Sequence, residues 1–303
     1  MLKGLAITPP VVGRISIGRV IERKGKRLPE KDDQFTLTTQ VQTGSGWINH
    51  PLNDTLPKDD KGKLRSIPVR LMFNAPELNL RADYHLFDRK TGRATCVGNG
   101  EKARRFDKDN GIVHVECPGP DGCPFAKGEC KAYARFNVLV GDGTDDALGS
   151  FVLRSTSINT IRTIAARLEY FRAVSGGRLA CMPLELKLRG KSTRMSFGAT
   201  IYYVDLVVRS GLTLEQAIAE AIKRDTERKE AGFDQQALDQ AATQGFANGA
   251  FEELDDDGTA VIEEFYPPAK GEQELQQKPV NTNGLRGKLE AKAAKLPLQG
   301  EAA

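Results

Sequence analysis

A cysteine-rich loop constrains the fold of this chain more than any other feature. Four of its five cysteines lie close together in the sequence, and the last three of them fall in CPGPDGCPFAKGEC. The proline, glycine and charged residues of that loop leave almost no apolar side chain from which to build a core. A tetrahedral zinc ion held by thiolates would fix the shape of such a loop, and its binding would contribute to folding. We therefore predict a structural zinc ion with four ligands, Cys96, Cys117, Cys123 and Cys130.

The spacing of these cysteines leaves alternatives open. It reads C-x20-C-x5-C-x6-C, without the close C-x2-C pairs of a common zinc ribbon. The prolines and glycines after Cys117 favour turns that would bring it near Cys123, and His114 could replace one of the four ligands. Two disulfides, an iron–sulfur cluster or unligated thiols are the other interpretations. The fifth cysteine, Cys181, opens an apolar strand and is expected to be a small buried hydrophobe.

Charge is distributed unevenly along the 303 residues. The net charge is +4, but residues 251–303 hold 6 Lys and Arg against 11 Asp and Glu, which gives −5 there and about +9 for the rest. A basic body with an acidic tail is frequent among nucleic-acid-binding proteins, although a solvated surface with a disordered tail would give the same numbers. No apolar run approaches the roughly 18 residues of a membrane helix, and the N-terminus does not read as a signal peptide. We expect a cytoplasmic protein that binds no membrane.

The first part of the chain has the alternating pattern of β-strands. Strands are expected at ISIGRVIERKG and QFTLTTQVQTG, with GKRLPEKDDQ as a charged loop between them and PLNDTLPKDDKGKLR as a polar loop after them. Further strands are expected on both sides of the cysteine loop, at IPVRLMF, NLRADYHLFDR, ATCV, AYARFNVLVG and GSFVLRST. Together they predict a mostly antiparallel sheet built around that loop.

Two helices are predicted in the second half. The segment SINTIRTIAARLEYFRAVSGG has apolar residues at helical spacing, an N-cap among residues 155–157 and two glycines at its end. A long hairpin follows, and then LTLEQAIAEAIKRDTERKEAG, in which Thr213 and Gln216 fit a capping box. The fold class is therefore α+β, with one packing helix after the first strands and another after the hairpin. We divide the chain into a zinc-containing core (1–211), a helical segment (212–245) and an acidic, disordered tail (246–303).

Two surfaces are candidates for recognition. The tip of the long hairpin gathers positive charge next to an aromatic residue, a combination that suits single-stranded DNA; these candidate residues are Lys187, Arg189, Lys191, Arg194 and Tyr202. In the tail, DDDGTAVIEEFYPP is either a docking motif for a basic groove or a solubilising segment. Deleting Phe251–Ala303 is expected to leave stability nearly unchanged, because a polar segment buries little apolar area.

Trp47, the only tryptophan, lies beside a His-Pro turn. It is expected to be a core anchor, with a base-stacking platform as the alternative. His50 in that turn could hydrogen-bond the backbone as easily as take part in chemistry.

No sequence motif for catalysis is found. The chain lacks a Walker-type phosphate loop, a dinucleotide-binding glycine motif, H-E-x-x-H and a nucleophile elbow. Acidic pairs such as Asp32-Asp33 and Asp59-Asp60 are expected in exposed loops, where solvation explains them. We predict that the protein is not an enzyme, with a zinc hydrolase as the minor alternative.

Several stretches, taken in order, resemble the recombination directionality factor family, whose members are accessory proteins of large serine integrases in phages and integrative elements. The stretches are RISIGRVIERKGKRLPEKDDQFTLTT, GWINHPL, IPVRLMFNAPELNLRADYHLFDRKTG with ATCVGNG, the cysteine loop, and GSFVLRSTSINTI with its helix. The resemblance covers roughly residues 5–210. It implies metal ligation by Cys117, Cys123 and Cys130, with Cys96 as the fourth ligand.

The resemblance implies a non-catalytic factor that binds a site-specific recombinase and biases its direction. The residues that would touch the recombinase do not carry over from the family. The alternative is a single-stranded DNA-binding or annealing protein, suggested by the basic body. The sequence leaves the oligomeric state open.

Overall fold

The computed structural model describes residues 10–23, 26–43, 46–142, 149–192, 194, 198–246, 261, 262 and 265. All of them belong to one compact unit, Met1–Phe265. Within these ranges, no helix has the length and apolar character needed to span a membrane.

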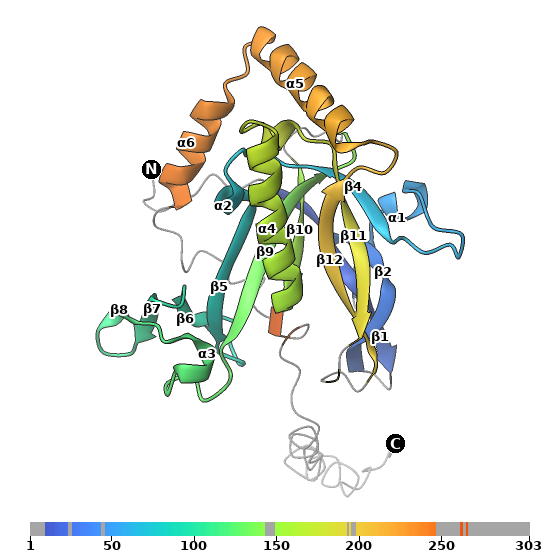
Figure 1. The fold of residues 1–303 in the computed structure, drawn as a ribbon. Coiled ribbons are helices and arrows are strands. Elements are labelled where there is room, and N and C mark those ends of the chain that lie inside the picture. The colour runs from blue at the N-terminus through green and yellow to red at the C-terminus, as the bar shows by residue number, and fades with distance from the viewer. Residues whose placement is uncertain are drawn as a thin grey trace, which may run out of the picture. The chain divides into compact units, whose positions relative to one another are not determined.

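The strands form a large sheet in which almost every described pairing is antiparallel (Figure 1). Its main path runs β3-β2-β1-β10-β9-β5-β6-β7-β8, and β4 joins β9 to the β11–β12 hairpin. Only β1 and β10, among the described strands, pair in parallel. The bounds are β1 Val11–Arg23, β2 Lys26–Thr43, β3 Gly46–Asn49, β4 Ser66–Arg70, β5 Leu80–Phe87, β6 Ala94–Gly98, β7 Lys102–Asp107, β8 Gly111–Glu116, β9 Lys131–Val140, β10 Ser150–Ser155, β11 Leu184–Ser192 and β12 Thr200–Val208.

Helices complete an α+β fold with a mostly antiparallel sheet, as predicted. Ser157 caps α4 by accepting a hydrogen bond from the backbone N–H of Thr160. Thr213 and Gln216 form the expected capping box of α5. The helical elements are α1 Leu52–Thr55, α2 Pro76–Asn79, α3 Gly119–Gly122, α4 Ile158–Val174, the 3-10 turn η1 Leu179–Cys181, α5 Leu214–Glu230 and α6 Gln235–Phe246.

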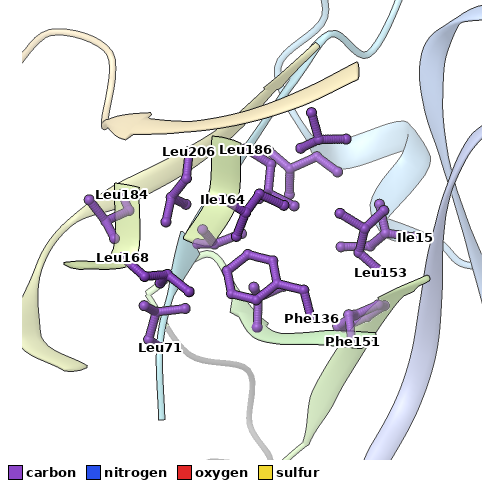
Figure 2. Packing of buried hydrophobic residues seen from close by; sticks show 14 of the residues in the cluster. Ile15, Leu71, Phe136, Phe151, Leu153, Ile164, Leu168, Leu184, Leu186 and Leu206 are labelled. Carbon is purple, nitrogen blue, oxygen red and sulfur yellow. The ribbon is translucent and has the colours of Figure 1, made fainter. Parts of the chain in front are cut away.

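One hydrophobic core lies between α4, one face of the sheet and the β11–β12 hairpin. Figure 2 shows side chains from all three meeting there, including Phe136 from β9, Leu168 from α4 and Leu206 from β12. The helix contributes one stripe, because Ile161, Ile164, Leu168 and Phe171 are buried at helical spacing. Burial of these apolar side chains is the main force that holds the layers together.

The prediction of a charged loop at residues 25–34 is wrong, because β2 begins at Lys26 and includes most of these residues. Its residues pair with β1 from Arg23 opposite Lys26 onward, and this pairing with a neighbouring strand outweighs their low strand propensity.

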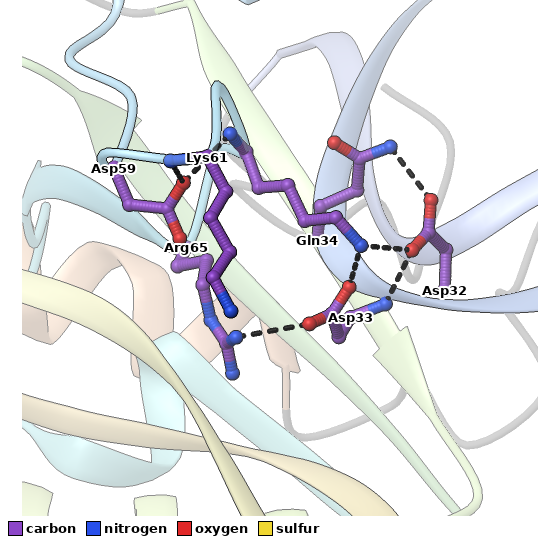
Figure 3. Close-up of polar contacts among 7 residues, drawn as sticks. Asp32, Asp33, Gln34, Asp59, Lys61 and Arg65 are labelled. Carbon is purple, nitrogen blue, oxygen red and sulfur yellow. Dashed lines mark hydrogen bonds and ion pairs between the residues drawn. The ribbon is translucent and has the colours of Figure 1, made fainter.

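The acidic pair Asp32-Asp33 therefore lies in a strand, not in an exposed loop. Figure 3 shows both carboxylates held by cations from the segment before β4. Lys63 contacts both, and Arg65 donates to Asp33 at 2.9 Å. The hydrogen bond from Lys63 lowers the pKa of Asp32. Asp59 remains in a loop, but its carboxylate accepts from the backbone N–H groups of residues 61 and 63.

Most of the predicted tail lies outside the described residues. Four of its residues are described, however: Phe246, which ends α6, and then Val261, Ile262 and Phe265. Val261 is only 2% exposed. The ring of Phe265 meets that of Tyr133 edge to face, with centroids 6.2 Å apart. At Val261 and Phe265 the expectation of a tail that buries little apolar area is wrong, because Val261 is buried and the ring of Phe265 contacts Tyr133 of β9.

Candidate metal centre

Five elements bring the four clustered cysteines together. Cys96 lies on β6, Cys117 follows β8, Cys123 ends α3 and Cys130 precedes β9. The hairpin β7–β8, which was not predicted from the sequence, returns the chain from β6 to the loop. The backbone N–H of Cys117 donates to the carbonyl of Glu101 at 2.9 Å, so the first cysteine of the loop is anchored at the turn between β6 and β7.

All four cysteines line one small cavity. Its volume is about 20 Å³, which is room for a single water-sized occupant. Glu116, Phe125 and Ala126 also line it, whereas Cys181 does not. The four cysteines that lie close together in the sequence are thus also neighbours in the fold.

Gly98 leaves the space that the Cys117 thiol fills. A Cβ atom at position 98 would lie 2.7 Å from Sγ of Cys117 and 2.8 Å from Cβ of Ala103, closer than van der Waals contact allows. Because Gly98 has no side chain, the thiol can lie directly against the backbone of β6.

Burial and mutual repulsion disfavour free thiolates in the cavity. Burial, followed by the other three clustered thiols, raises the pKa of Cys130 to about 11. Burial also raises the pKa of Cys96, against the opposite effect of the Arg105 guanidinium. A divalent cation at the centre would remove this repulsion and favour the thiolates.

Arg105 and Glu129 tie the cysteine loop to the neighbouring strands. The guanidinium of Arg105 lies 3.8 Å from the ring centroid of Phe125, a cation–π contact between β7 and the loop. Glu129 pairs with Arg89, in the turn after β5, at 3.1 Å. These contacts and the burial of Ala126 give the loop some order of its own.

The thiols are near one another but are not arranged as metal ligands. In the described part of the chain, no three His, Cys, Asp or Glu side chains are grouped closely enough to hold a metal ion. All five cysteines are free of disulfides. His114 is exposed on β8 and does not line the cavity, so the structure gives no support to it as a replacement ligand. Four sulfur donors around a space of atomic size suit zinc, and the binding itself stays a prediction.

Cys181 lies in the hydrophobic core, 3% exposed, as expected of a buried small hydrophobe. Its carbonyl oxygen accepts a hydrogen bond from Arg70 at 2.8 Å.

The basic hairpin residues are largely engaged with their own surroundings. Arg189 pairs with buried Asp205 at 3.2 Å, and Lys187 lies 3.7 Å from Glu185. Lys191 donates to Asn159 at 2.7 Å, Arg194 is exposed, and Tyr202 packs against the core. Lys187 and Arg189 already face carboxylates of their own hairpin and so have less to offer a phosphate backbone, and DNA binding at this tip stays a prediction.

Trp47 and His50 are both explained by local contacts. Trp47 is half-buried on β3, and the guanidinium of Arg14 lies 3.7 Å from its ring centroid. Nδ1 of His50 accepts a hydrogen bond from the backbone N–H of Leu52 at 3.2 Å, and its ring meets Phe151 edge to face. Burial lowers the pKa of His50, which is typical of an imidazole with a structural role.

The comparison with known protein families gives a match that spans the cysteine loop and α4. The chain matches the family described as Gp3-like, recombination directionality factor-like, over residues 12–209. It belongs to this family. The match covers more than half of the 303 residues, begins at the second residue of β1, and includes the four clustered cysteines and β12. No curated protein and no solved structure matches the chain. Family membership places the chain among proteins with a recombination directionality factor-like role.

Proposed function

We propose that this protein is a zinc-stabilised, non-catalytic accessory factor that binds a site-specific recombinase and biases the direction of recombination. The family match over residues 12–209 carries the proposal. The fold is consistent with an adaptor, because the buried side chains of Arg70 and Asp205 pair with Glu220 and Arg189 and so join structural elements to one another.

The direct test is a recombination assay with the recombinase of the mobile element that encodes the chain. Adding the protein should change the ratio of excision to integration, and a pull-down should recover the recombinase. Matched reactions without the protein, and with heat-denatured protein, provide the controls. Unchanged product ratios together with no detectable complex would contradict the proposal.

The proposed metal is a single structural zinc ion held by Cys96, Cys117, Cys123 and Cys130. When bound, it would serve as a cross-link between β6, the cysteine loop and the start of β9. Four thiolates would close its coordination shell, which leaves no open position for a substrate and argues against the hydrolase alternative.

Paired cysteine variants test the metal. Cys123→Ser should lower both the zinc content, from about one ion per chain, and the thermal stability, because metal binding is coupled to folding. Cys181→Ser is the matched control: it removes a buried thiol outside the cavity and should leave the zinc content unchanged. Elemental analysis and thermal unfolding measure both quantities. A metal-free wild type of full stability, purified without chelator, would refute the zinc proposal.

The runner-up function is single-stranded DNA binding or annealing. The net positive charge of residues 1–250 favours this function, whereas the ion pairs that Lys187 and Arg189 make within the hairpin do not. Binding of oligonucleotides that weakens steeply with salt would support it.

A further inference from the structure

A tight turn sets α5 and α6 at an angle above the upper end of α4 (Figure 1). Gly232, just after α5, has a left-handed φ of 84°. The backbone N–H groups of Gly232 and Phe233 donate to the carbonyls of Lys229 and Arg228, which is the Schellman arrangement that commonly ends a helix. The chain then turns back, and α6 meets the body through Ala242, which is fully buried.

The two helices border an open cavity of about 900 Å³. A volume of this size lies within the range of ligand-binding pockets. The walls come from the C-terminal half of α5, from α6, from Asn74 and from the glycines after α4. We call this space the α5–α6 cavity.

Two rows of polar side chains on α6 line the α5–α6 cavity. Gln235, Asp239 and Thr243 form the first row, and three glutamines form the second: Gln236, Gln240 and Gln244. Each row repeats every four residues and so follows one side of the helix. The three glutamines of the second row are exposed, and within the described part of the chain their side-chain amides make no hydrogen bond.

The spacing of the second row matches the backbone of an extended peptide. Four residues of a helix advance about 6 Å along its axis, and two residues of an extended strand advance about 6.6 Å. A glutamine amide both donates and accepts, so each one can pair with the N–H or C=O of every second residue of such a peptide. The row is therefore suited to hold an extended chain alongside α6.

Gln235 in the first row carries an acceptor without a donor. Its side-chain nitrogen donates to the carbonyl of Met72 at 3.0 Å and to Oδ1 of Asp239 at 2.8 Å. Both partners are acceptors, which assigns the orientation of the amide. Its oxygen, Oε1, is buried and accepts no hydrogen bond from the described residues. Leaving a buried acceptor unpaired costs free energy, so a ligand that brings N–H groups is favoured here.

Asp239 adds a carboxylate beside this acceptor. It is partly buried and also accepts from the backbone N–H of Asn74 at 3.2 Å. Burial raises the pKa of Asp239, against the effect of its hydrogen bonds, and a nearby cation would favour the ionised form. An unpaired acceptor next to a carboxylate favours a planar cation with several N–H donors, which is the guanidinium of arginine.

Charge on the two sides of the α5–α6 cavity orients such an arginine. On the α5 side, Asp225 accepts from Arg178 at 3.1 Å and from Lys229 at 2.8 Å, so one carboxylate faces two cations. On the α6 side, Asp234 and Asp239 contribute two carboxylates. An arginine that enters the cavity is therefore attracted toward α6.

We propose that the α5–α6 cavity binds an extended peptide segment of a partner protein, with the peptide backbone along Gln236, Gln240 and Gln244 and an arginine side chain against Gln235 and Asp239. The inference goes beyond the proposed directionality function. It does not depend on whether a recombinase is the partner.

A synthetic peptide tests the site without any partner protein. The probe is a fluorescein-labelled heptapeptide of alternating serine and threonine around a central arginine, because threonine favours extended backbone. The comparison peptide has citrulline at the centre, which keeps the shape of arginine without its charge. Fluorescence anisotropy with the full chain gives both affinities. The arginine peptide should bind about tenfold more tightly, since charge-assisted hydrogen bonds are about twice as strong as neutral ones.

Variants separate the two parts of the site. Gln240→Ala with Gln244→Ala should weaken the binding of both peptides by about tenfold, because it removes partners of the peptide backbone and keeps the carboxylate. Asp239→Asn should instead remove the preference for arginine over citrulline. The matched controls are Gln42→Ala on β2 and Glu230→Gln at the end of α5. Both residues are exposed and do not line the cavity, so both affinities should stay unchanged.

The test does not rest on one variant folding. Alanine is a better helix former than glutamine, so α6 should persist in the double variant, and thermal unfolding identifies any variant that fails to fold. For such a case the wild-type chain supplies a second measurement by NMR. The side-chain amide signals of Gln236, Gln240 and Gln244 should shift when the arginine peptide is added, and that of Gln42 should not.

Absence of binding, or equal affinities for the arginine and citrulline peptides, would overturn the proposal. Unchanged binding of the arginine peptide by Gln240→Ala with Gln244→Ala would overturn it as well, since the peptide would then lie elsewhere on the surface.

Discussion

At the scale of single residues, the absence of one side chain is as important as the four thiols around the candidate metal centre. Gly98 on β6 allows the Cys117 thiol to lie against the backbone, where a Cβ atom would be 2.7 Å from the sulfur. The cysteine pattern is visible in the sequence, but the need for glycine at this position follows from the pairing of Gly98 with Ala103 across β6 and β7.

Gly98→Ala should therefore destabilise the protein by about 1 to 3 kcal/mol, the usual cost of overpacking a closed site. It should also lower the zinc content, because Cys117 would be displaced. Gly122→Ala, in the cysteine loop, is the control: its Cβ would meet only Pro118, at 3.2 Å, and its effect should be clearly smaller. Chemical denaturation and elemental analysis measure both. Equal effects of the two substitutions would contradict this account of Gly98.

The ion pairs of Figure 3 make the stability of the protein depend on pH, which is again an effect of single residues. The hydrogen bond from Lys63 lowers the pKa of Asp32 in the folded state. The folded protein then binds fewer protons than the unfolded chain, so the contribution to stability is present above the ordinary carboxyl pKa of about 4 and is lost as the pH falls below it.

Lys63→Met should consequently destabilise the protein at pH 7 and have a smaller effect at acidic pH. The measurement is the free energy of unfolding of both proteins across this range. Lys61→Met is the control, because Lys61 donates its hydrogen bond to Asp59 from the backbone N–H, which the substitution keeps. A constant difference between Lys63→Met and wild type at all pH values would show that the carboxylates contribute nothing through this pair.

At the scale of elements, a buried arginine fastens α5 to the sheet. The side chain of Arg70 on β4 is 5% exposed and lies 2.5 Å from Glu220 of α5. Asp142 and the carbonyl of Cys181 are its other partners. The capping box of α5 was predicted from its sequence, but nothing local to the helix indicates this attachment, because its partner lies far away in the chain.

Glu220→Gln should lower the free energy of unfolding by about 1 to 2 kcal/mol, since removing one partner leaves a buried guanidinium less well compensated. The effect stays below that of an isolated buried pair because Asp142 remains. Glu227→Gln makes the same change on the same helix, at an exposed pair with Lys223, and should cost little. If both variants unfold at the same denaturant concentration, Arg70 does not hold α5 in place.

At the scale of the whole molecule, the acidic C-terminal region divides into two parts. The compact unit extends to Phe265, and buried Val261 lies within it. Deleting residues 251–303 should therefore lower stability by about 1.5 to 3 kcal/mol, the value of burying one apolar side chain such as that of Val261, whereas deleting residues 266–303 should leave it nearly unchanged. Thermal unfolding of the two truncated chains decides this. Equal melting temperatures would restore the original expectation of a tail that does not pack.

The sequence alone determined the local features of this protein. The positions and caps of α4 and α5, the strand alternation and the grouping of four cysteines follow from local sequence patterns, because propensities act locally. The ordered series of motifs was enough to identify the family, and the match over residues 12–209 confirms it.

Tertiary structure decided what depends on contacts between distant residues. Strand pairing placed the charged residues after Lys26 in β2 and set Gly98 against Cys117. It also buried Val261 and brought the ring of Phe265 against Tyr133 of β9. These features are absent from local sequence patterns because each arises from the register of strands that are far apart in the chain.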